Sequence, residues 1–236
     1  QMGQVALGAG NDFTVNFDGN QLLNLQVNGD SINALAQNGG LLKADGGQVL
    51  MTGKSASAML HAVVNNQGAI EARTLNGKAG RITLDGGDVG TVKVGGSLQA
   101  HAQNTYGSGG VIEAKGATVE TQLGTQLNAL ASNGQTGTFK VSAKNVQIQP
   151  TAASAGETAY ADTLSRSLAS TNIELASTEG DLNLAGPVTW NSANGLTLSS
   201  AGNVNLDGNV TASGIGSRLT VNAGGDINLN SKVGLT

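Results

Sequence analysis

Residues 196–212 read LTLSSAGNVNLDGNVTA and residues 219–235 read LTVNAGGDINLNSKVGL, and the two stretches align without a gap. Most of the polar letters differ between them, whereas apolar residues recur after 23 positions, at the pairs Leu198/Val221, Val204/Ile227, Leu206/Leu229 and Val210/Val233. A similarity that returns at a fixed period of roughly 20–50 residues is typical of a solenoid, in which each repeat is one structural unit stacked on the next.

The repeat extends one unit further back, because Ile173 opens a similar stretch, IELASTEGDLNLAGPVTW. Each unit contains short runs in which apolar and polar residues alternate, separated by turns rich in Gly, Asn and Asp. Alternation with a period of two places every second side chain on one face of a strand. Three short strands and three turns in each unit predict one coil per repeat, stacked in parallel on its neighbour. We therefore expect an all-β parallel β-helix.

A looser form of the same unit runs through the middle of the chain, where strands ending in Ala-containing segments are joined by longer Gly- and Asn-rich turns. These units cover residues 39–53, 67–87, 95–116 and 125–145. The spacing is 30 residues from Ile82 to Ile112 and 29 from Ile112 to Val141. We interpret them as coils with longer loops than those of the C-terminal repeats.

Three segments depart from this pattern. Residues 14–27 form two alternating runs around an Asp-Gly pair, which predicts a short hairpin outside the coils. Residues 54–66 place apolar side chains at helical spacing and predict a short amphipathic helix. Residues 161–168 predict two helical turns. The resulting division is a β-helix with longer loops over 1–149, a connecting insertion over 150–171 and regular 23-residue repeats over 172–236.

The composition fits this architecture and excludes several functions. The 236 residues include 36 glycines and no cysteine, and only 12% are charged, against roughly 25% in an ordinary globular domain. The formal net charge is −4 and the Lys and Arg residues are scattered, so a nucleic-acid interface is not expected. No apolar run approaches the ~20 residues that cross a bilayer, so we expect no transmembrane segment.

Few residues suggest a functional site. A β-helical enzyme acting on polysaccharides needs clustered carboxylates, and Asp85, Asp88 and Glu113 are candidates if neighbouring coils bring them together. The simpler interpretation is that the two aspartates are turn residues and the glutamate faces solvent. We expect no catalysis, no metal ion and no cofactor.

Tyr106 and Trp190 are the candidates for carbohydrate binding, because an exposed aromatic ring can stack on a sugar face. Tyr106 lies in the longest loop of the looser coils, and Trp190 follows the end of a strand. The alternative is that each ring packs or caps the end of a coil.

Two long segments resemble a known family. Residues 46–87, GGQVLMTGKSASAMLHAVVNNQGAIEARTLNGKAGRITLDGG, are similar to the coil-plus-helix segment of filamentous-haemagglutinin-like exoproteins of Gram-negative bacteria. VVNNQGAIEA, residues 63–72, is the most characteristic part. Residues 160–206 resemble the region in which regular repeats resume in these proteins. The two segments occur in the family's order and cover most of the chain.

The resemblance implies a right-handed parallel β-helix secreted to the bacterial cell surface, with an outer-membrane two-partner transporter as the partner that exports the full-length protein. Members of the family serve in adhesion, in competition between bacteria or in delivery of a C-terminal module. The family's secretion domain carries Asn-Pro-Asn motifs, whereas the two prolines here are Pro150 and Pro187. We therefore expect the chain to begin late in, or just after, that domain.

The function expected is that of a shaft segment of a large secreted adhesin that attaches to host cells, surfaces or other bacteria, through a surface glycan or receptor. Two alternatives remain open at this point. One is a β-helical polysaccharide-active enzyme, which a carboxylate cluster in a groove would favour. The other is a passive spacer that presents a distal toxin or effector, which a smooth polar surface would favour.

Overall fold

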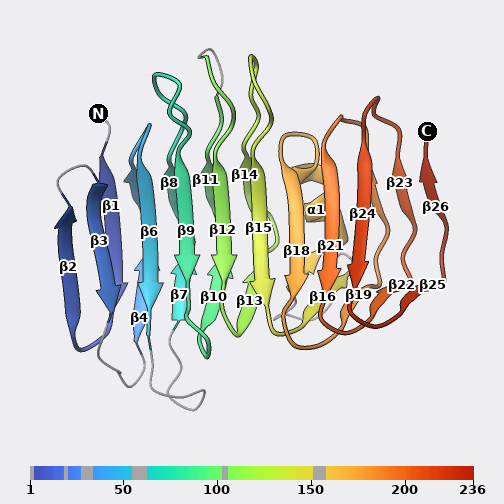
Figure 1. The fold of residues 1–236 in the computed structure, drawn as a ribbon, viewed down its shortest axis with the longest axis horizontal. Helices are drawn as coiled ribbons and strands as arrows, with labels where there is room; N and C mark the ends of the chain where they lie inside the picture. Colours follow the sequence, from blue (N-terminus) through green and yellow to red (C-terminus); the bar gives the residue numbers. More distant parts are fainter. Residues whose placement is uncertain (1–2, 19–20, 28–33, 55–62, 103–105, 151–157) are drawn as a thin grey trace.

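The computed structural model describes residues 3–18, 21–27, 34–54, 63–102, 106–150 and 158–236. They form a rod of stacked coils, with the N- and C-termini at opposite ends of its long axis (Figure 1). One side of the rod is a parallel sheet of eight strands to which successive coils contribute one strand each. In order across the sheet these are β1 (Gln4–Ala9), β6 (Gln48–Gly53), β9 (Arg81–Asp85), β12 (Val111–Lys115), β15 (Thr138–Ala143), β18 (Asn172–Ser177), β21 (Gly195–Ser200) and β24 (Arg218–Ala223).

Two four-stranded sheets complete the coils in the first half of the rod, and all their pairings are parallel. The first contains β4 (Leu35–Asn38), β7 (Val63–Asn66), β10 (Thr91–Val94) and β13 (Thr118–Thr121). The second contains β5 (Leu41–Lys43), β8 (Ala69–Glu71), β11 (Ser97–Gln99) and β14 (Gln126–Asn128). Each coil here therefore has three strands, such as β10, β11 and β12, and the chain is an all-β parallel β-helix as predicted.

Different sheets close the coils of the second half. One contains β16 (Val146–Gln149), β17 (Ala159–Tyr160), β19 (Leu182–Leu184), β22 (Val204–Leu206) and β25 (Ile227–Leu229), and the other β20 (Val188–Trp190), β23 (Val210–Ala212) and β26 (Val233–Leu235). The exchange of sheets falls around the predicted connecting segment, 150–171. The eight-stranded sheet nevertheless runs through this region without a break, and one buried cluster extends along both halves.

The 23-residue register is confirmed at every position on which it was predicted. Leu198 pairs with Val221 in the eight-stranded sheet, and the other three apolar pairs face each other in β22–β25 and β23–β26. Val204 and Val210 are fully buried and Leu206 is nearly so, whereas Asn205 between them is partly exposed. The recurring apolar residues Val204, Leu206 and Val210 therefore point into the rod, and Asn205 between the first two points outward.

The predicted register of the looser coils is right at one step and wrong at the next. Ile82 pairs with Ile112 as expected, but Ile112 pairs with Phe139 rather than with Val141. Val141 instead pairs with Ala114. Residues 139 and 141 both point inward because they are two apart in a strand, so alternation alone cannot choose between them. The aromatic ring of Phe139 fits inside the coil, where it is 1% exposed.

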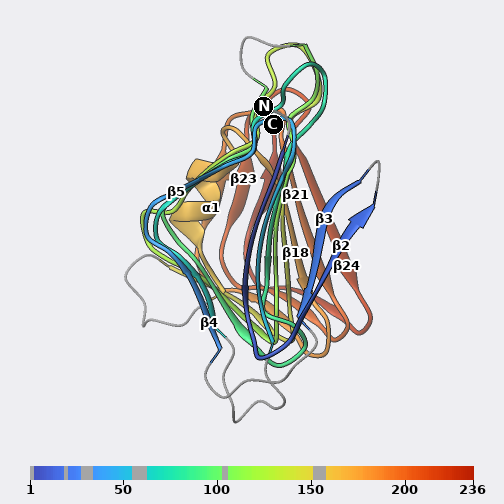
Figure 2. The ribbon, with the colours of Figure 1, turned by 90° about the vertical axis from the view of Figure 1, so that its left-hand side faces the viewer.

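The predicted hairpin is confirmed. β2 (Phe13–Asp18) and β3 (Gln21–Val27) pair antiparallel and project from the side of the rod at its N-terminal end (Figure 2). The hairpin lies against β1, where a methyl group added to Gly8 would approach the side chains of Leu25 and Phe13 at 2.7 and 3.1 Å. The small residue in β1 therefore allows this close packing.

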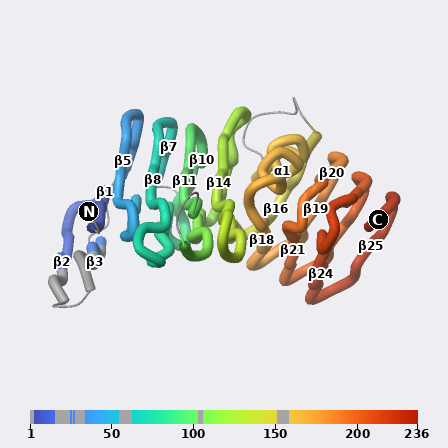
Figure 3. Tube along the Cα trace, turned by 90° about the horizontal axis from the view of Figure 1, so that it is seen from above, coloured from blue at the N-terminus to red at the C-terminus, as the bar shows by residue number. Residues whose placement is uncertain are grey.

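The helix predicted over 161–168 is confirmed as α1 (Ala161–Ser167). It lies between β14 and β20 on the side of the rod where a strand would otherwise stand (Figure 3). The helix predicted over 54–66 is wrong at its C-terminal end, and its residues 55–62 lie outside the described residues. Val63–Asn66 forms strand β7, because Val64 and Asn66 point inward and the strand pairs with neighbours on both sides.

Candidate functional site

Three neighbouring coils carry long loops that rise beyond the edge of the eight-stranded sheet (Figures 1 and 2). The loops precede β9, β12 and β15 and are described over 73–80, over 101–102 and 106–110, and over 129–137. We call these residues the crest. The connections before β18, β21 and β24 rise less far, so the crest ends in a step after its third loop.

Stacked glycines hold the crest loops at the spacing of the coils beneath them. A methyl group added to Gly110 would meet the carbonyl oxygen of Gly80, and one added to Gly137 would meet that of Gly110. Nearer the tip, a methyl group on Gly107 would lie 3.3 Å from the Cα atom of Gly77. Only a residue without a Cβ atom allows this backbone approach.

Hydrogen bonds join each crest loop to the next. The Thr74 hydroxyl donates to the carbonyl oxygen of Ser108 at 2.6 Å, which links the first loop to the second. The Gly109 N–H donates to the Gln135 carbonyl oxygen at 2.9 Å, and the Gln135 N–H donates to the Ser108 hydroxyl at 3.2 Å. The crest is therefore a three-layered extension of the solenoid with a backbone fixed by its own contacts.

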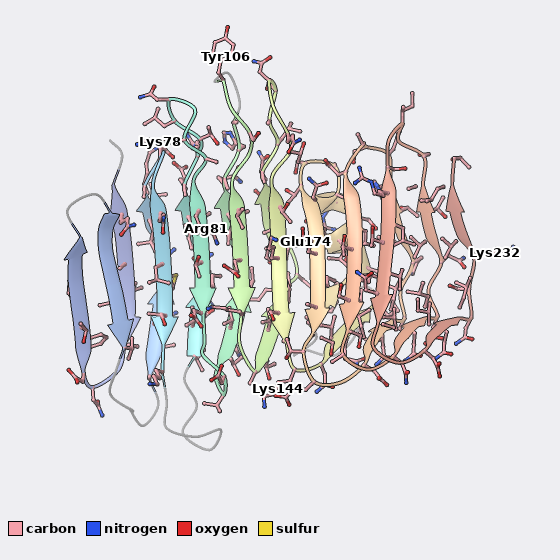
Figure 4. All side chains as sticks on the ribbon, viewed as in Figure 1. Lys78, Arg81, Tyr106, Lys144, Glu174 and Lys232 are labelled. Carbon is pink, nitrogen blue, oxygen red and sulfur yellow. The ribbon has the colours of Figure 1, made fainter. Side chains whose placement is uncertain are left out.

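Tyr106 lies in the middle loop of the crest and points away from the rod (Figure 4). Its side chain is 85% exposed, so the ring is open to a ligand. Lys78 belongs to the neighbouring loop and is also exposed. The crest thus presents an exposed aromatic ring and an exposed cation on neighbouring loops, and carbohydrate binding by Tyr106 stays a prediction.

Trp190, the second residue proposed for carbohydrate binding, is 5% exposed. Its indole N–H donates to the carbonyl oxygen of Asn194 at 2.9 Å, across the turn that leads from β20 to β21. The ring therefore packs inside the coil and fixes this turn, which fits the alternative interpretation of Trp190 as a coil-end packing residue. A sugar would have no ring face to stack on in this position.

The three candidate carboxylates lie around Lys115, a residue that no sequence pattern marked as a candidate. Lys115 Nζ lies 3.0 Å from Asp85 Oδ2, and Glu113 Oε2 lies 3.2 Å from Arg81 Nη1. The hydrogen bond donated to Asp85 raises the pKa of Lys115 against the opposing effect of burial, and the charges of Asp85, Glu113 and Asp88 add to the rise. Asp85 and Glu113 thus each form an ion pair with a cation on the neighbouring coil.

Asp85 also has the turn role expected of it, since its Oδ1 atom accepts the N–H of Gly87 at 2.9 Å. Asp85, Asp88 and Lys115 line a groove of 350 Å³ at the carboxyl ends of the strands, together with the ion pair of Lys144 and Glu179. In this groove Asp85 is paired with Lys115 and Glu179 with Lys144, which is typical of an ion-pair ladder between coils, whereas among the described residues the structure gives Asp88 no ion pair.

A second charged cluster lies where the crest leaves the rod. Lys43 Nζ lies 2.8 Å from Glu71 Oε2 and 3.2 Å from Asp45 Oδ2, and Glu71 Oε1 lies 2.6 Å from Arg73 Nη2. Burial opposes the charge of Asp45, yet the Arg73 N–H and the Lys43 ammonium outweigh it and hold the pKa of Asp45 below its ordinary value. Burial and the positive charge of Arg73 lower the pKa of His101 on the next coil.

His61, the other histidine, lies outside the described residues. Within the described ranges no group of three or more His, Cys, Asp or Glu residues is placed to hold a metal ion. Among the residues that the structure describes, no helix is long and apolar enough to cross a membrane. Comparisons with protein-family models, curated proteins and solved structures found no match to this chain.

Proposed function

We propose that this chain is a shaft segment of a large secreted bacterial adhesin of the filamentous-haemagglutinin-like type, and that the crest contacts the surface to which the bacterium attaches. The proposal includes export by an outer-membrane two-partner transporter and a location at the cell surface. Support comes from the sequence resemblance and from the β-helical rod that the resemblance implies. A rod of stacked coils extends a contact surface over a distance, and loops on a rigid scaffold are the usual place for binding residues.

The observation that carries the proposal is the exposure of Tyr106 on a crest whose loops are bonded to one another. A tyrosine offers a large contact area with few rotatable bonds, so holding it in place before binding lowers the entropy lost on contact. Exposed aromatic side chains of this kind are typical of recognition surfaces. A passive spacer has no need of a built crest, and the ion-paired carboxylates around Lys115 supply no separate argument for an enzyme.

The test is attachment of protein-coated beads to cultured epithelial cells and to a glycan array. Tyr106→Ala is expected to reduce attachment about tenfold, which corresponds to about 1.4 kcal/mol of binding free energy. The matched control is Ile215→Ala, because Ile215 is 98% exposed but lies on a turn of the regular coils, away from the crest. Equal attachment by the two variants, with thermal midpoints unchanged, would contradict a contact role for the crest.

A further inference from the structure

A polar groove of 540 Å³ lies at the step where the crest ends. Its wall is the flank of the third crest loop, at Gln135 and Thr136, and its floor crosses the first residues of β18, β21 and β24. Glu174 marks this floor on the outer face of the eight-stranded sheet (Figure 4). The volume lies within the range of about 300–1,000 Å³ that is common for ligand sites.

Asn172 fixes the wall of the groove to its floor. Its Nδ2 atom donates to the carbonyl oxygens of Thr136 at 2.8 Å and Gly137 at 3.2 Å, and its Oδ1 atom accepts the N–H of Gly195 at 2.8 Å. This one side chain therefore joins the third crest loop to two coils. The groove keeps its shape because its two sides share a hydrogen-bonding residue.

The adjoining turn at residues 192–194 is fixed as well. Trp190 donates its indole N–H to the Asn194 carbonyl oxygen, and the Asn194 side chain donates to the carbonyl oxygen of Leu168 at 2.7 Å. Asn194 also lines the groove. Buried Trp190 is thus a positioning residue for the rim of the groove, although its ring is closed to solvent.

The groove exposes polar side chains that are not used inside the molecule. Among the described residues, the structure gives no hydrogen bond or ion pair to the side chains of Gln135, Thr197, Arg218 and Thr220. Thr197 and Thr220 are register partners on adjacent coils, and Arg218 stands beside Gly195, which has no side chain to fill the space. Glu174, the carboxylate in the groove, is paired with Lys140 at 2.8 Å, so its charge is matched.

We propose that this groove binds a glycan that carries carboxylate groups, such as a uronic-acid oligosaccharide. The Arg218 guanidinium can bind a carboxylate through two parallel hydrogen bonds. The threonine hydroxyls and the Gln135 amide both donate and accept, which matches the hydroxyl groups of a sugar. The bare floor at Gly195 gives the sugar ring room to lie between Arg218 and the crest wall.

The composition of the groove favours a glycan over the other polymers. A peptide that binds as a helix or in an extended form needs apolar pockets for its side chains, and Ile173 and Ala193 are the apolar residues that line this groove. A nucleic acid needs several cations for its phosphates, whereas Arg218 is the unpaired cation here. This inference goes beyond the proposed function, since it concerns a site apart from Tyr106 and requires neither export nor attachment to cells.

The test is isothermal titration calorimetry of the whole chain with an oligogalacturonate tetramer, at low and at physiological salt. The wild-type chain is expected to bind the tetramer and to bind its neutral methyl ester about tenfold more weakly, because the carboxylate partner of Arg218 is then lost. Arg218→Gln is expected to weaken binding of the acidic tetramer by the same factor, about tenfold.

The control is Lys232→Gln. Lys232 is a cation with no ion pair in the described part of the chain and lies in the same terminal coil as Arg218, but it directly precedes β26 on another side of the rod, at the C-terminal end (Figure 4). It is expected to leave the affinity within about twofold, since exposed charges more than about 10 Å apart are largely screened at physiological salt. Equal losses in the two variants would overturn the proposal, because they would indicate a general effect of net charge.

A third variant tests the groove without changing charge. A methyl group on Gly195 would meet its nearest atoms at 3.6–3.8 Å, ordinary contact distances, so Gly195→Gln can fold and its side chain then occupies the groove. Binding of the tetramer is expected to be lost while the circular dichroism spectrum and thermal midpoint stay those of the wild type. Unchanged binding in Gly195→Gln or no binding by the wild type would overturn the proposal. Tighter binding of a dextran sulfate oligosaccharide, which carries sulfates and no carboxylates, than of the uronate would overturn it as well.

Discussion

Asn38 donates a hydrogen bond from its Nδ2 atom to the Oδ1 atom of Asn66 at 2.7 Å, although the two residues lie inside the rod on neighbouring coils. Asn66 in turn donates to the carbonyl oxygen of Gly95 at 2.6 Å, on the coil after that. The buried amides of Asn38 and Asn66 therefore link three successive coils. On the third coil the register partner of Asn66 is Val94, which has an apolar side chain.

Replacing Asn66 alone is expected to destabilise the rod. Asn66→Val leaves the Asn38 amide and the Gly95 carbonyl oxygen without their partner in a buried place, and each such loss costs about 1–3 kcal/mol. Urea denaturation measures the loss. Asn38→Val is expected to destabilise the rod as well, because Asn38 also donates to the Ala69 carbonyl oxygen at 3.3 Å and accepts the Gly40 N–H at 3.1 Å. A free energy of unfolding for Asn66→Val equal to that of the wild type would contradict a pairing role.

The inward assignment of the repeat is tested by charge. Leu206→Asp places a carboxylate where the side chain is 2% exposed, and Val204→Asp does so at a fully buried site. A buried, unpaired charge costs several kcal/mol, so both variants are expected to unfold the C-terminal coils. Hydrogen exchange of strands β21 to β26 measures this directly. Thr211→Asp, on the exposed face of β23, is the control and is expected to change stability by less than about 0.5 kcal/mol.

The glycine contacts of the crest are tested by adding one methyl group. Gly110→Ala would place its Cβ atom against the carbonyl oxygen of Gly80, a backbone atom that cannot move alone, and is expected to cost about 1–3 kcal/mol. Gly39→Ala is the matched control, because open space surrounds that position. Thermal unfolding of the two variants should differ by several degrees. Equal midpoints would show that the crest loops do not depend on close stacking.

His101 is expected to make the stability of the rod depend on pH. Its pKa in the folded chain lies below the value of about 6.5 in the unfolded chain, since burial and Arg73 disfavour the imidazolium form. Between these two pKa values the unfolded chain binds more protons than the folded chain. The contribution of His101 to the free energy of unfolding is therefore full above about pH 6.5 and is lost as the pH falls through the folded pKa. His101→Gln is expected to flatten this decline in thermal midpoint. If the thermal midpoint of His101→Gln falls with pH as steeply as that of the wild type, other groups cause the pH dependence.

The regular half of the rod was predictable to the residue because its coils differ in length by no more than one residue in a turn. The offset is 23 residues at Ile173/Leu196 and between the last two coils, and 22 at Leu182/Val204, after the one extra residue in the first turn of the first unit. The looser half was predictable in kind only. There, Phe139 and Val141 both point inward, so the pattern gave the face correctly and the partner of Ile112 incorrectly.

The segment 63–66 shows a second limit. Val63 and Val64 fit the helical spacing of the predicted helix, whereas Val64 and Asn66 alternate as inward residues of a strand, and pairing of β7 with neighbours on both sides favours the strand. The sites were less predictable than the fold. Tyr106 was selected as a candidate because it is an aromatic residue in the longest loop of the looser coils, whereas Lys115 and Arg218 gain their surroundings from coils far away in sequence.

The eight-stranded sheet stays in register while the coils that feed it differ in length and even replace a strand with α1. One side of the rod thus keeps the same strand pairing throughout, whereas the strands and loops on its other sides differ from coil to coil. Segments added there, like the crest or α1, alter what the surface presents and leave the spacing between rungs unchanged. A rod of this kind can therefore carry different surface features along its length on one common sheet, with the three crest loops as a single unit because they are bonded to one another.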